Sequence, residues 1–197
     1  MTCFVLALLL AQAPRTIIVT ADGPGETTAT LQRYENGTPV GAPVRVALGR
    51  AGMAAAKNEG DGRSPAGSFR IESVFGHAPW SEAARHGFQL PYRPLTSQTR
   101  CVDDPRSSHY NRILEETPAN KDWTSAEEML IPDYKWGAVI SYNTGRPTPG
   151  AGSCIFLHVT RSIEKPTAGC TAMSEADLLD LLRWATPDTV LIQRLKP

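Results

Sequence analysis

Short runs in which apolar and polar side chains alternate dominate the chain from residue 15 onward. A period of two is typical of strands with one buried face, and Gly-Pro-Gly, Asn-Gly and Gly-Arg turns separate the runs. This pattern predicts a mainly β fold. The expected strands cover residues 16–20, 28–34, 44–48, 53–56, 67–73, 137–142, 153–159 and 189–193.

The strand expected at residues 153–159 has two distinct faces. Because successive side chains of a strand point to opposite sides, Cys154, Phe156 and His158 share one face. The apolar residues at 155, 157 and 159 share the other. We expect a central strand with one purely apolar face and one face that carries a cysteine and a histidine.

The best-defined helix begins after Ser174. This serine is a suitable N-cap, and Asp177 follows it at the N3 position of a box-like cap. Leucines recur behind the cap at helical spacing, and Pro187 ends the pattern. The sequence therefore predicts a C-terminal helix followed by a last strand.

Residues 75–136 show little periodicity and predict a long loop-rich insertion. Its segment from Cys101 to Asn111 gathers polar and aromatic groups, which suggests a lid with Tyr110 and Asn111 as substrate contacts. The alternative is that Asp103-Asp104-Pro105 is a simple turn. Asn143, just past another strand, either borders a site or shapes a turn.

The first residues form an apolar run, 3–11, followed by Ala11-Gln12-Ala13. A run of this kind before a small-x-small pattern predicts a secretory signal peptide over residues 1–13 and a single domain over residues 15–197. It is shorter than the ~20 residues that a spanning helix needs, so we expect no permanent membrane anchor. A buried first strand is the alternative, because no Lys or Arg precedes the run.

The charge balance excludes one class of partner. Twenty Lys and Arg residues are matched by twenty Asp and Glu residues among 197. Nucleic-acid binders usually carry a cationic surplus, so we expect no nucleic-acid partner. The length suffices for one hydrophobic core without metals or other cross-links.

Cys170 and His158 are the candidates for covalent chemistry. Cys170 follows Gly169 in a turn, where a side chain can project and backbone N–H groups can face an anion. A thiol is only a few per cent thiolate at neutral pH, and a nearby imidazole lowers its pKa. His158 is the candidate base, and the alternative is that both residues are packing residues.

A zinc site built from Cys154, His158, Cys170 and His109 is a second chemical interpretation. Geometry argues against it, because Cys154 and His158 are four residues apart on one strand. Their Cα atoms should then lie ~13 Å apart, too far for one ion. We therefore expect no metal and no cofactor.

The same spacing limits the disulfides. If His158 contacts Cys170, Cys154 cannot also reach Cys170, since bridged Cα atoms lie within ~7 Å. Cys3 leaves with the signal peptide, so one free thiol and one pair remain. The sequence leaves open whether Cys101 and Cys154 are bridged or are two buried free thiols.

Two motifs together resemble L,D-transpeptidases with a YkuD-type catalytic domain. The first is the turn-and-strand Asn58-Glu59-Gly60-Asp61-Gly62-Arg63-Ser64-Pro65-Ala66-Gly67-Ser68-Phe69. The second joins Gly152-Ser153-Cys154-Ile155-Phe156-Leu157-His158 to Pro166-Thr167-Ala168-Gly169-Cys170, which is similar to the family's histidine strand and cysteine turn. The resemblance covers most of the chain after residue 15.

The resemblance implies a β-sandwich or barrel-like domain in which Cys170 is the nucleophile and His158 the base. Backbone N–H groups at Cys170, Gly169 and Thr171 would hold the oxyanion. It also implies peptidoglycan stem peptides as substrate, export to the periplasm or cell envelope, and a monomer. Candidate substrate contacts are Tyr110, Asn111, Asn143, Ser153 and Thr167.

The chain departs from the family signature at two positions. The usual Ser/Thr-His-Gly-Cys, with Arg two residues later, has Ala168 in the His position and Ala172 in the Arg position. The missing Arg puts recognition of a substrate carboxylate in doubt, unless Arg161, Lys165 or Arg112 replaces it. The chain thus resembles a diverged branch of the family.

Three functions remain open from the sequence. The first is a cysteine L,D-transpeptidase that forms a thioester acyl-enzyme and cross-links the cell wall. The second is an L,D-carboxypeptidase or other hydrolase on the same scaffold, with water as acceptor. The third is a non-catalytic wall-binding protein in which Ala168 and Ala172 mark lost activity.

Overall fold

The computed structural model describes residues 14–197. The segment predicted to be a signal peptide, residues 1–13, lies outside this range. The strands are β1 (Arg15–Ala21), β2 (Thr28–Glu35), β3 (Thr38–Ala47), β4 (Met53–Ala54), β5 (Ser64–Pro65), β6 (Gly67–Gly76), β7 (Tyr92–Pro94), β8 (Thr99–Val102), β9 (Ile113–Glu115), β10 (Ala126–Glu128), β11 (Trp136–Ile140), β12 (Phe156–Val159), β13 (Thr171–Met173) and β14 (Val190–Leu195). The α-helices are α1 (Trp80–Ala83) and α2 (Glu175–Trp184), and the 3₁₀ helices are η1 (Ala84–His86) and η2 (Pro132–Tyr134).

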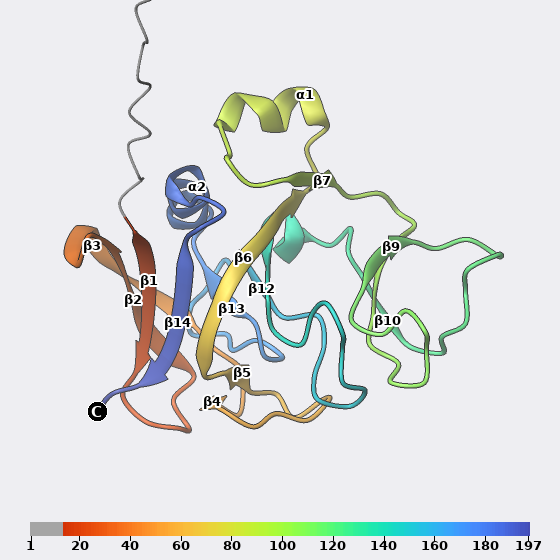
Figure 1. The fold of residues 1–197 in the computed structure, drawn as a ribbon, viewed down its shortest axis with the longest axis horizontal. Coiled ribbons are helices and arrows are strands. Elements are labelled where there is room, and N and C mark those ends of the chain that lie inside the picture. The colour runs from red at the N-terminus through yellow and green to blue at the C-terminus, as the bar shows by residue number, and fades with distance from the viewer. Residues whose placement is uncertain (1–13) are drawn as a thin grey trace, which may run out of the picture.

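A nine-stranded sheet in the order β11-β12-β13-β3-β2-β1-β14-β6-β7 forms the body of the molecule (Figure 1). Strand β11 also pairs with β6, so every strand of this sheet except β7 belongs to a closed ring. Closure leaves few unpaired edges, which is how barrel-like β proteins avoid exposing backbone groups. The prediction of a mainly β, barrel-like fold is confirmed.

The N-terminal hairpin shows how the sequence builds this ring. Ile17 and Val19 of β1 are fully buried, and the β-branched side chains suit a half-buried strand. The turn between β2 and β3 holds Asn36 and Gly37, with φ of 51° and 77°. Two left-handed residues make the tight turn that matches strand twist, which explains the Asn-Gly pair here.

The helix α2 covers the main core. Ser174 is its N-cap and its hydroxyl accepts a hydrogen bond from the Asp177 N–H at 3.2 Å. Its buried residues are Leu178, Leu181 and Leu182, which pack into the same cluster as the inward residues of the barrel strands. The predicted cap and apolar stripe are confirmed.

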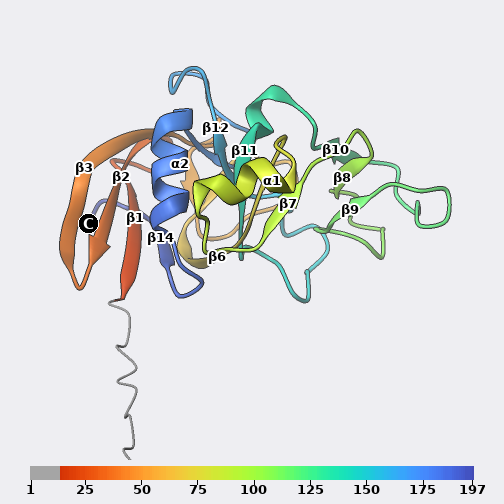
Figure 2. The same ribbon diagram turned by 90° about the horizontal axis from the view of Figure 1, so that it is seen from above.

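The insertion carries more regular structure than its sequence pattern suggests. Strands β10, β8 and β9 form a three-stranded antiparallel sheet, and α1, η1, β7 and η2 occupy other parts of residues 75–136. Both views place the small sheet at one end of the molecule and β1 to β3 at the other (Figures 1 and 2).

The region around residue 170 also differs from expectation. Residues 171–173, expected as part of a turn, form β13 between β12 and β3. Strand β12 begins only at Phe156, because Cys154 has φ of 54° and cannot continue a strand.

None of the helices within residues 14–197 has the length and apolar character required to span a membrane.

We expect Ser174→Ala to lower the free energy of unfolding by about 1 kcal/mol, because it removes the acceptor that caps α2. Urea unfolding followed by circular dichroism measures the change. Ser162→Ala, at an exposed position of the loop before β13, is the matched control and should stay within about 0.5 kcal/mol. Equal effects of the two variants would contradict a capping role.

Candidate active site

Cys170 and His158 are brought together by the parallel pairing of β12 and β13. Leu157 lies opposite Thr171 and His158 opposite Ala172, so Cys170 sits at the start of β13 beside the chain at Phe156. Both Cys170 and His158 are 6% exposed, and both line one cavity of about 400 Å³. The structure thus places the two predicted reactive residues in the same site.

The turn before Cys170 is held by hydroxyl groups. The Thr167 Oγ1 donates to the Cys170 carbonyl at 2.7 Å and accepts from the Gly169 N–H at 3.0 Å. The Ser64 hydroxyl donates to the same carbonyl at 3.0 Å. A side chain at Gly169 would lie 2.8 Å from the Arg63 carbonyl oxygen, and Gly169 has φ of 148°. This position therefore requires glycine.

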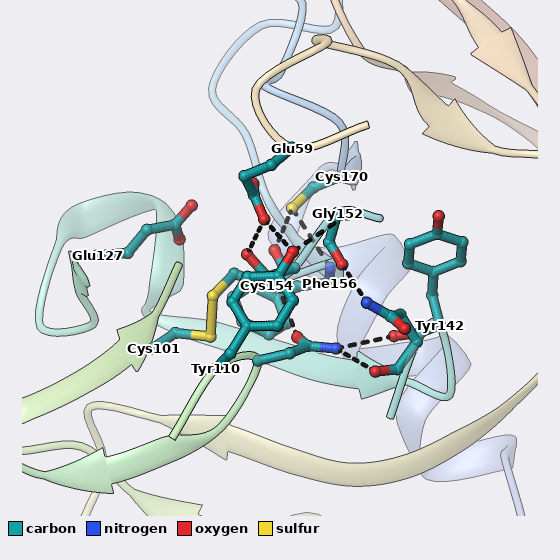
Figure 3. The surroundings of a disulfide bond; sticks show 12 residues. Glu59, Cys101, Tyr110, Glu127, Tyr142, Gly152, Cys154, Phe156 and Cys170 are labelled. Carbon is teal, nitrogen blue, oxygen red and sulfur yellow. Dashed lines mark hydrogen bonds between the residues drawn. A yellow bond between two sulfur atoms is a disulfide. The ribbon is translucent and has the colours of Figure 1, made fainter. Parts of the chain in front are cut away.

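The Cys170 thiol has two hydrogen-bond partners, one in the backbone at the start of β12 and one just before this strand. The Phe156 N–H donates to Sγ at 3.3 Å, and the thiol donates to the Cys154 carbonyl at 3.5 Å (Figure 3). Burial raises the pKa of this thiol to about 12, and the negative charge of Glu127 acts in the same direction. In the free protein Cys170 is therefore a neutral thiol at pH 7.

The His158 ring is oriented by its own backbone. Its Nδ1 lies 2.9 Å from the Val159 carbonyl oxygen, and a carbonyl only accepts, so we assign the proton of the neutral imidazole to Nδ1. This leaves Nε2 as the nitrogen that can take a proton. Burial lowers the pKa of His158, which keeps the ring neutral.

Residues 154–157 and 159 divide between two apolar clusters in the predicted alternating way, although only 156–159 form a strand. Ile155, Leu157 and Val159 belong to the main core. Cys154 and Phe156 belong to a second apolar cluster that also contains Cys170 and Tyr134. The Tyr134 ring meets His158 edge-on, with centroids 5.4 Å apart.

The cavity wall carries charges of both signs. Its acidic members are Glu59, Asp103, Glu127 and Asp133, and its basic members are Arg50, Lys57 and Lys165. The buried Lys57 ammonium donates to Asp61 at 2.6 Å and to the Arg63 carbonyl at 2.5 Å, so it holds its own loop. One carboxylate oxygen of Asp103 is buried and has no hydrogen-bond partner within residues 14–197.

Glu127 and Tyr134 are cavity residues that the sequence did not indicate. The Tyr134 hydroxyl donates to the Glu127 carboxylate at 2.8 Å. Burial raises the pKa of Glu127 to about 7, and the nearby charges of Asp103 and Glu59 add to the rise. Glu127 lies in the three-residue strand β10 beside a second glutamate, Glu128. So short a strand gives no sign of which of the two faces the cavity.

Tyr110 and Ser153 meet at a carboxylate that belongs to the first motif. Both hydroxyls donate to Glu59, that of Ser153 at 2.6 Å, and the Gly152 N–H donates to the Tyr110 hydroxyl at 3.1 Å (Figure 3). Burial raises the pKa of Tyr110, so its hydroxyl stays protonated as a donor. Of the two, Ser153 lines the cavity.

Asn111 and Asn143 brace the chain on both sides of the site. The Asn111 amide donates to the carbonyls of Tyr142 and Asn143, at 3.1 and 2.7 Å, and accepts from the Cys154 N–H at 2.9 Å. The Asn143 amide donates to the carbonyls of Thr148 and Gly152. Neither residue is among those that line the Cys170 cavity within the described chain.

The structure contains a Cys101–Cys154 disulfide, one of the two alternatives left by the sequence. It ties β8 of the insertion to the segment before β12, with Cα atoms 6.0 Å apart. Cys170 is the free cysteine among residues 14–197. The same range holds no group of three or more His, Cys, Asp or Glu side chains arranged for a metal ion, and His109 instead packs on Trp123.

The two alanines that depart from the family signature lie in different environments. Ala172 is fully buried in β13, between His158 and Ala47 in register, whereas Ala168 is exposed at the cavity. The Thr171 hydroxyl turns inward and donates to Gln193 at 2.6 Å. Of the three cations considered as replacements for the missing Arg, Lys165 lines the Cys170 cavity.

Residues 16–192 match the family model of the YkuD L,D-transpeptidase catalytic domain. No curated protein matches the chain. Similar solved structures include the helical cell shape determining protein Pgp2 from Campylobacter jejuni, at 13% identity and a TM-score of 0.49, covering 95% of this chain and 49% of that one. L,D-transpeptidase 3 from Mycobacterium tuberculosis, in complex with a faropenem-derived adduct, is 12% identical with a TM-score of 0.44, covering 92% and 60%.

L,D-transpeptidase 1 from Mycobacterium tuberculosis is 12% identical with a TM-score of 0.40, covering 92% of this chain and 62% of that one. This chain therefore spans about half the length of Pgp2 and less than two thirds of either mycobacterial protein.

We expect the double variant Cys101→Ser/Cys154→Ser to have a free energy of unfolding lower by about 2–4 kcal/mol, because the disulfide closes a loop of 53 positions in the unfolded chain. Urea unfolding without reductant measures the difference. Adding reductant should destabilise the wild type and leave the double variant unchanged. A wild type insensitive to reductant would contradict a stabilising bond.

We expect Glu127→Gln to gain stability over the wild type as pH rises. The folded pKa of Glu127 is about 7 and its ordinary value 4.5, so the wild type loses stability over this interval while the glutamine does not. The relative gain should be about 3 kcal/mol between pH 4 and pH 8 by urea unfolding. Glu128→Gln, on the exposed neighbour, should show no such trend.

Proposed function

The chain belongs to the L,D-transpeptidase family through a YkuD catalytic domain, and on this premise we propose that it is a cysteine acyltransferase acting on peptidoglycan stem peptides. The observation that carries the proposal is the placement of Cys170 and His158 at one cavity, with the proton of the neutral His158 ring assigned to Nδ1. Cys170 is the nucleophile and His158 the general base.

The first half-reaction forms a thioester. His158 Nε2 takes the proton of the Cys170 thiol, and the sulfur attacks the carbonyl carbon of the bond between diaminopimelate and the terminal D-alanine. The tetrahedral oxyanion is held by the backbone N–H of Cys170 and a neighbouring N–H, each typically worth about 3 kcal/mol. The Gly169 N–H is already donated to Thr167 Oγ1 in the free protein. The C–N bond then breaks, and the protonated His158 gives its proton to the departing amine of D-alanine.

The second half-reaction releases the thioester. A side-chain amine of another stem attacks the same carbonyl carbon, His158 accepts the proton that the amine loses, and the C–S bond breaks. The proton then returns to the Cys170 sulfur. The product is a cross-link between two stems, and water in place of the amine gives a shortened stem.

The charge state of the free site fits this order of events. The Cys170 pKa of about 12 and the lowered pKa of His158 make a neutral pair, so the thiolate forms only as its proton moves to the histidine. Cys170 Sγ and the His158 ring share no hydrogen bond within residues 14–197. Bound substrate must therefore bring Cys170 Sγ and His158 Nε2 within hydrogen-bond distance before the proton moves.

The proposed substrate also leads to assignments of its contact residues and of the protein's location. Ser153 and Thr167 are proposed to contact the stem peptide at the cavity, with Tyr110, Asn111 and Asn143 supporting that wall. Peptidoglycan lies outside the cytoplasmic membrane, so we propose an exported, monomeric catalytic domain in the periplasm or cell envelope. It needs no cofactor for this chemistry.

Incubation with a carbapenem, followed by intact mass spectrometry, tests the nucleophile and the base. We expect one adduct on the wild type, none on Cys170→Ala, and acylation slower by about 100-fold or more for His158→Ala, which lacks the base. His109→Ala is the matched control and should react like the wild type, since His109 lies against Trp123.

The acceptor is then identified with purified muropeptides and a free amine. A cross-linked product supports the transferase, and a shortened stem alone would assign water as acceptor. Folded, reduced wild type that forms no adduct and leaves muropeptides unchanged would overturn the proposal in favour of a non-catalytic wall-binding protein.

A further inference from the structure

Strand β10 of the insertion places a partly buried carboxylic acid at the reactive cavity. Glu127 lines the same cavity as Cys170, and Figure 3 shows its carboxylate directed toward the side where Glu59 and Cys170 lie. The mechanism proposed above does not use this residue. A carboxylate buried beside a thiol must affect that thiol, because like charges in a low-dielectric site oppose each other.

Tyr134 fixes where this carboxylate sits. Its hydroxyl donates to Glu127 at 2.8 Å, and its ring packs edge-on against three aromatic rings. The centroid distances are 5.7 Å to Phe75, 5.5 Å to Phe156 and 5.4 Å to His158. Such ring pairs prefer defined geometries, so the hydroxyl is held in one place and keeps the carboxylate at the wall.

Charged and titratable groups face Glu127 from every wall of the cavity. The acidic and thiol groups are Asp103 after β8, Glu59 in the loop after β4, Asp133 and Tyr134 in η2, and Cys170 before β13. The remaining groups are His158 on β12 and the cations Arg50, Lys57 and Lys165. Lys57 favours the thiolate of Cys170, whereas Glu127 opposes it.

We propose that Glu127, held by Tyr134, is a positioning residue that keeps the Cys170 thiol protonated until substrate enters the cavity. The proposal rests on the proposed function in one respect, because it takes Cys170 as the nucleophile. The carboxylate acts on the thiol through its charge across the cavity and does not touch the reacting carbonyl. The Tyr134 hydroxyl acts on Cys170 by holding Glu127, while the Tyr134 ring packs in the same apolar cluster as the thiol.

The sign of the effect follows from the charges. An ionised Glu127 raises the free energy of a neighbouring thiolate, and a protonated Glu127 does not. Removing the charge should therefore make Cys170 ionise at lower pH. The Tyr134 hydroxyl favours the ionised form of Glu127, so removing the hydroxyl should act in the same direction with a smaller effect.

Alkylation of Cys170 by iodoacetamide tests the proposal without any peptidoglycan substrate. Intact mass spectrometry follows the rate on the whole, disulfide-intact protein from pH 6 to pH 10, with Cys170→Ala to show that labelling is at this thiol. We expect Glu127→Gln to react about threefold faster or more at pH 8.5 and close to the wild-type rate at pH 6, where the wild-type Glu127 is itself mostly protonated. Glu128→Gln, the exposed neighbour on β10, should match the wild type.

Two further variants test the link through Tyr134. Tyr134→Phe keeps the packed ring and should accelerate alkylation by less than Glu127→Gln. The double variant Glu127→Gln/Tyr134→Phe should react no faster than Glu127→Gln alone, because the hydroxyl acts through the carboxylate. A general loosening of the site would instead raise the alkylation rate by the same factor at every pH from 6 to 10.

The results separate this proposal from the proposed function. Glu127→Gln that reacts no faster than Glu128→Gln, additive effects in the double variant, or thiols unreactive in all variants would overturn the role of Glu127. A wild type that forms no carbapenem adduct but shows the expected alkylation pattern would overturn the transferase assignment and leave the role of Glu127 intact.

Discussion

The site depends on one pairing, the parallel contact between β12 and β13. Three opposed residue pairs, from Leu157 with Thr171 to Val159 with Met173, fix the register. A shift of one residue would turn His158 to the opposite face of the sheet, because side chains alternate along a strand. The register therefore decides whether the histidine and the cysteine turn share a cavity. The hydroxyls of Ser64 and Thr167 hold the Cys170 carbonyl at the end of this pairing.

Burial has a chemical consequence at this pairing. Both Cys170 and His158 are removed from water, and each is thereby driven toward its neutral form. A neutral pair differs from the thiolate–imidazolium pairs of activated cysteines, in which charge is separated in advance. The insertion further disfavours the thiolate of Cys170, since it places the charge of Glu127 at the cavity wall.

Much of the barrel could be predicted because its signals are local. The β-branched runs of β1, the Asn36-Gly37 turn and the Ser174 cap each act within a few residues. The two faces of the 153–159 segment followed from alternation alone. Strand β13 could not be found in this way, because three residues carry too little pattern and its edges are set by distant partners.

The site was predictable only in part, for the same reason. Spacing and motif indicated Cys170 and His158, and their catalytic roles remain predictions. The bond between Cys101 and Cys154 depends on a Cα separation of 6.0 Å across 53 positions, which no local pattern reports. Glu127 is buried by tertiary contacts, and nothing in Ala126-Glu127-Glu128 distinguishes it from its exposed neighbour.

The protonated thiol next to the Cys101–Cys154 bond also bears on chemical durability. Disulfide exchange and oxidation to sulfenic acid both begin with a thiolate, and a thiol with a pKa of about 12 supplies very little of it at neutral pH. Cys170 shares an apolar cluster with both bridged cysteines, so its thiolate could exchange with their disulfide. Cys170 also lines the cavity, where oxidants that enter can reach its sulfur. Keeping the proton on sulfur therefore protects the Cys170 thiol and the disulfide together.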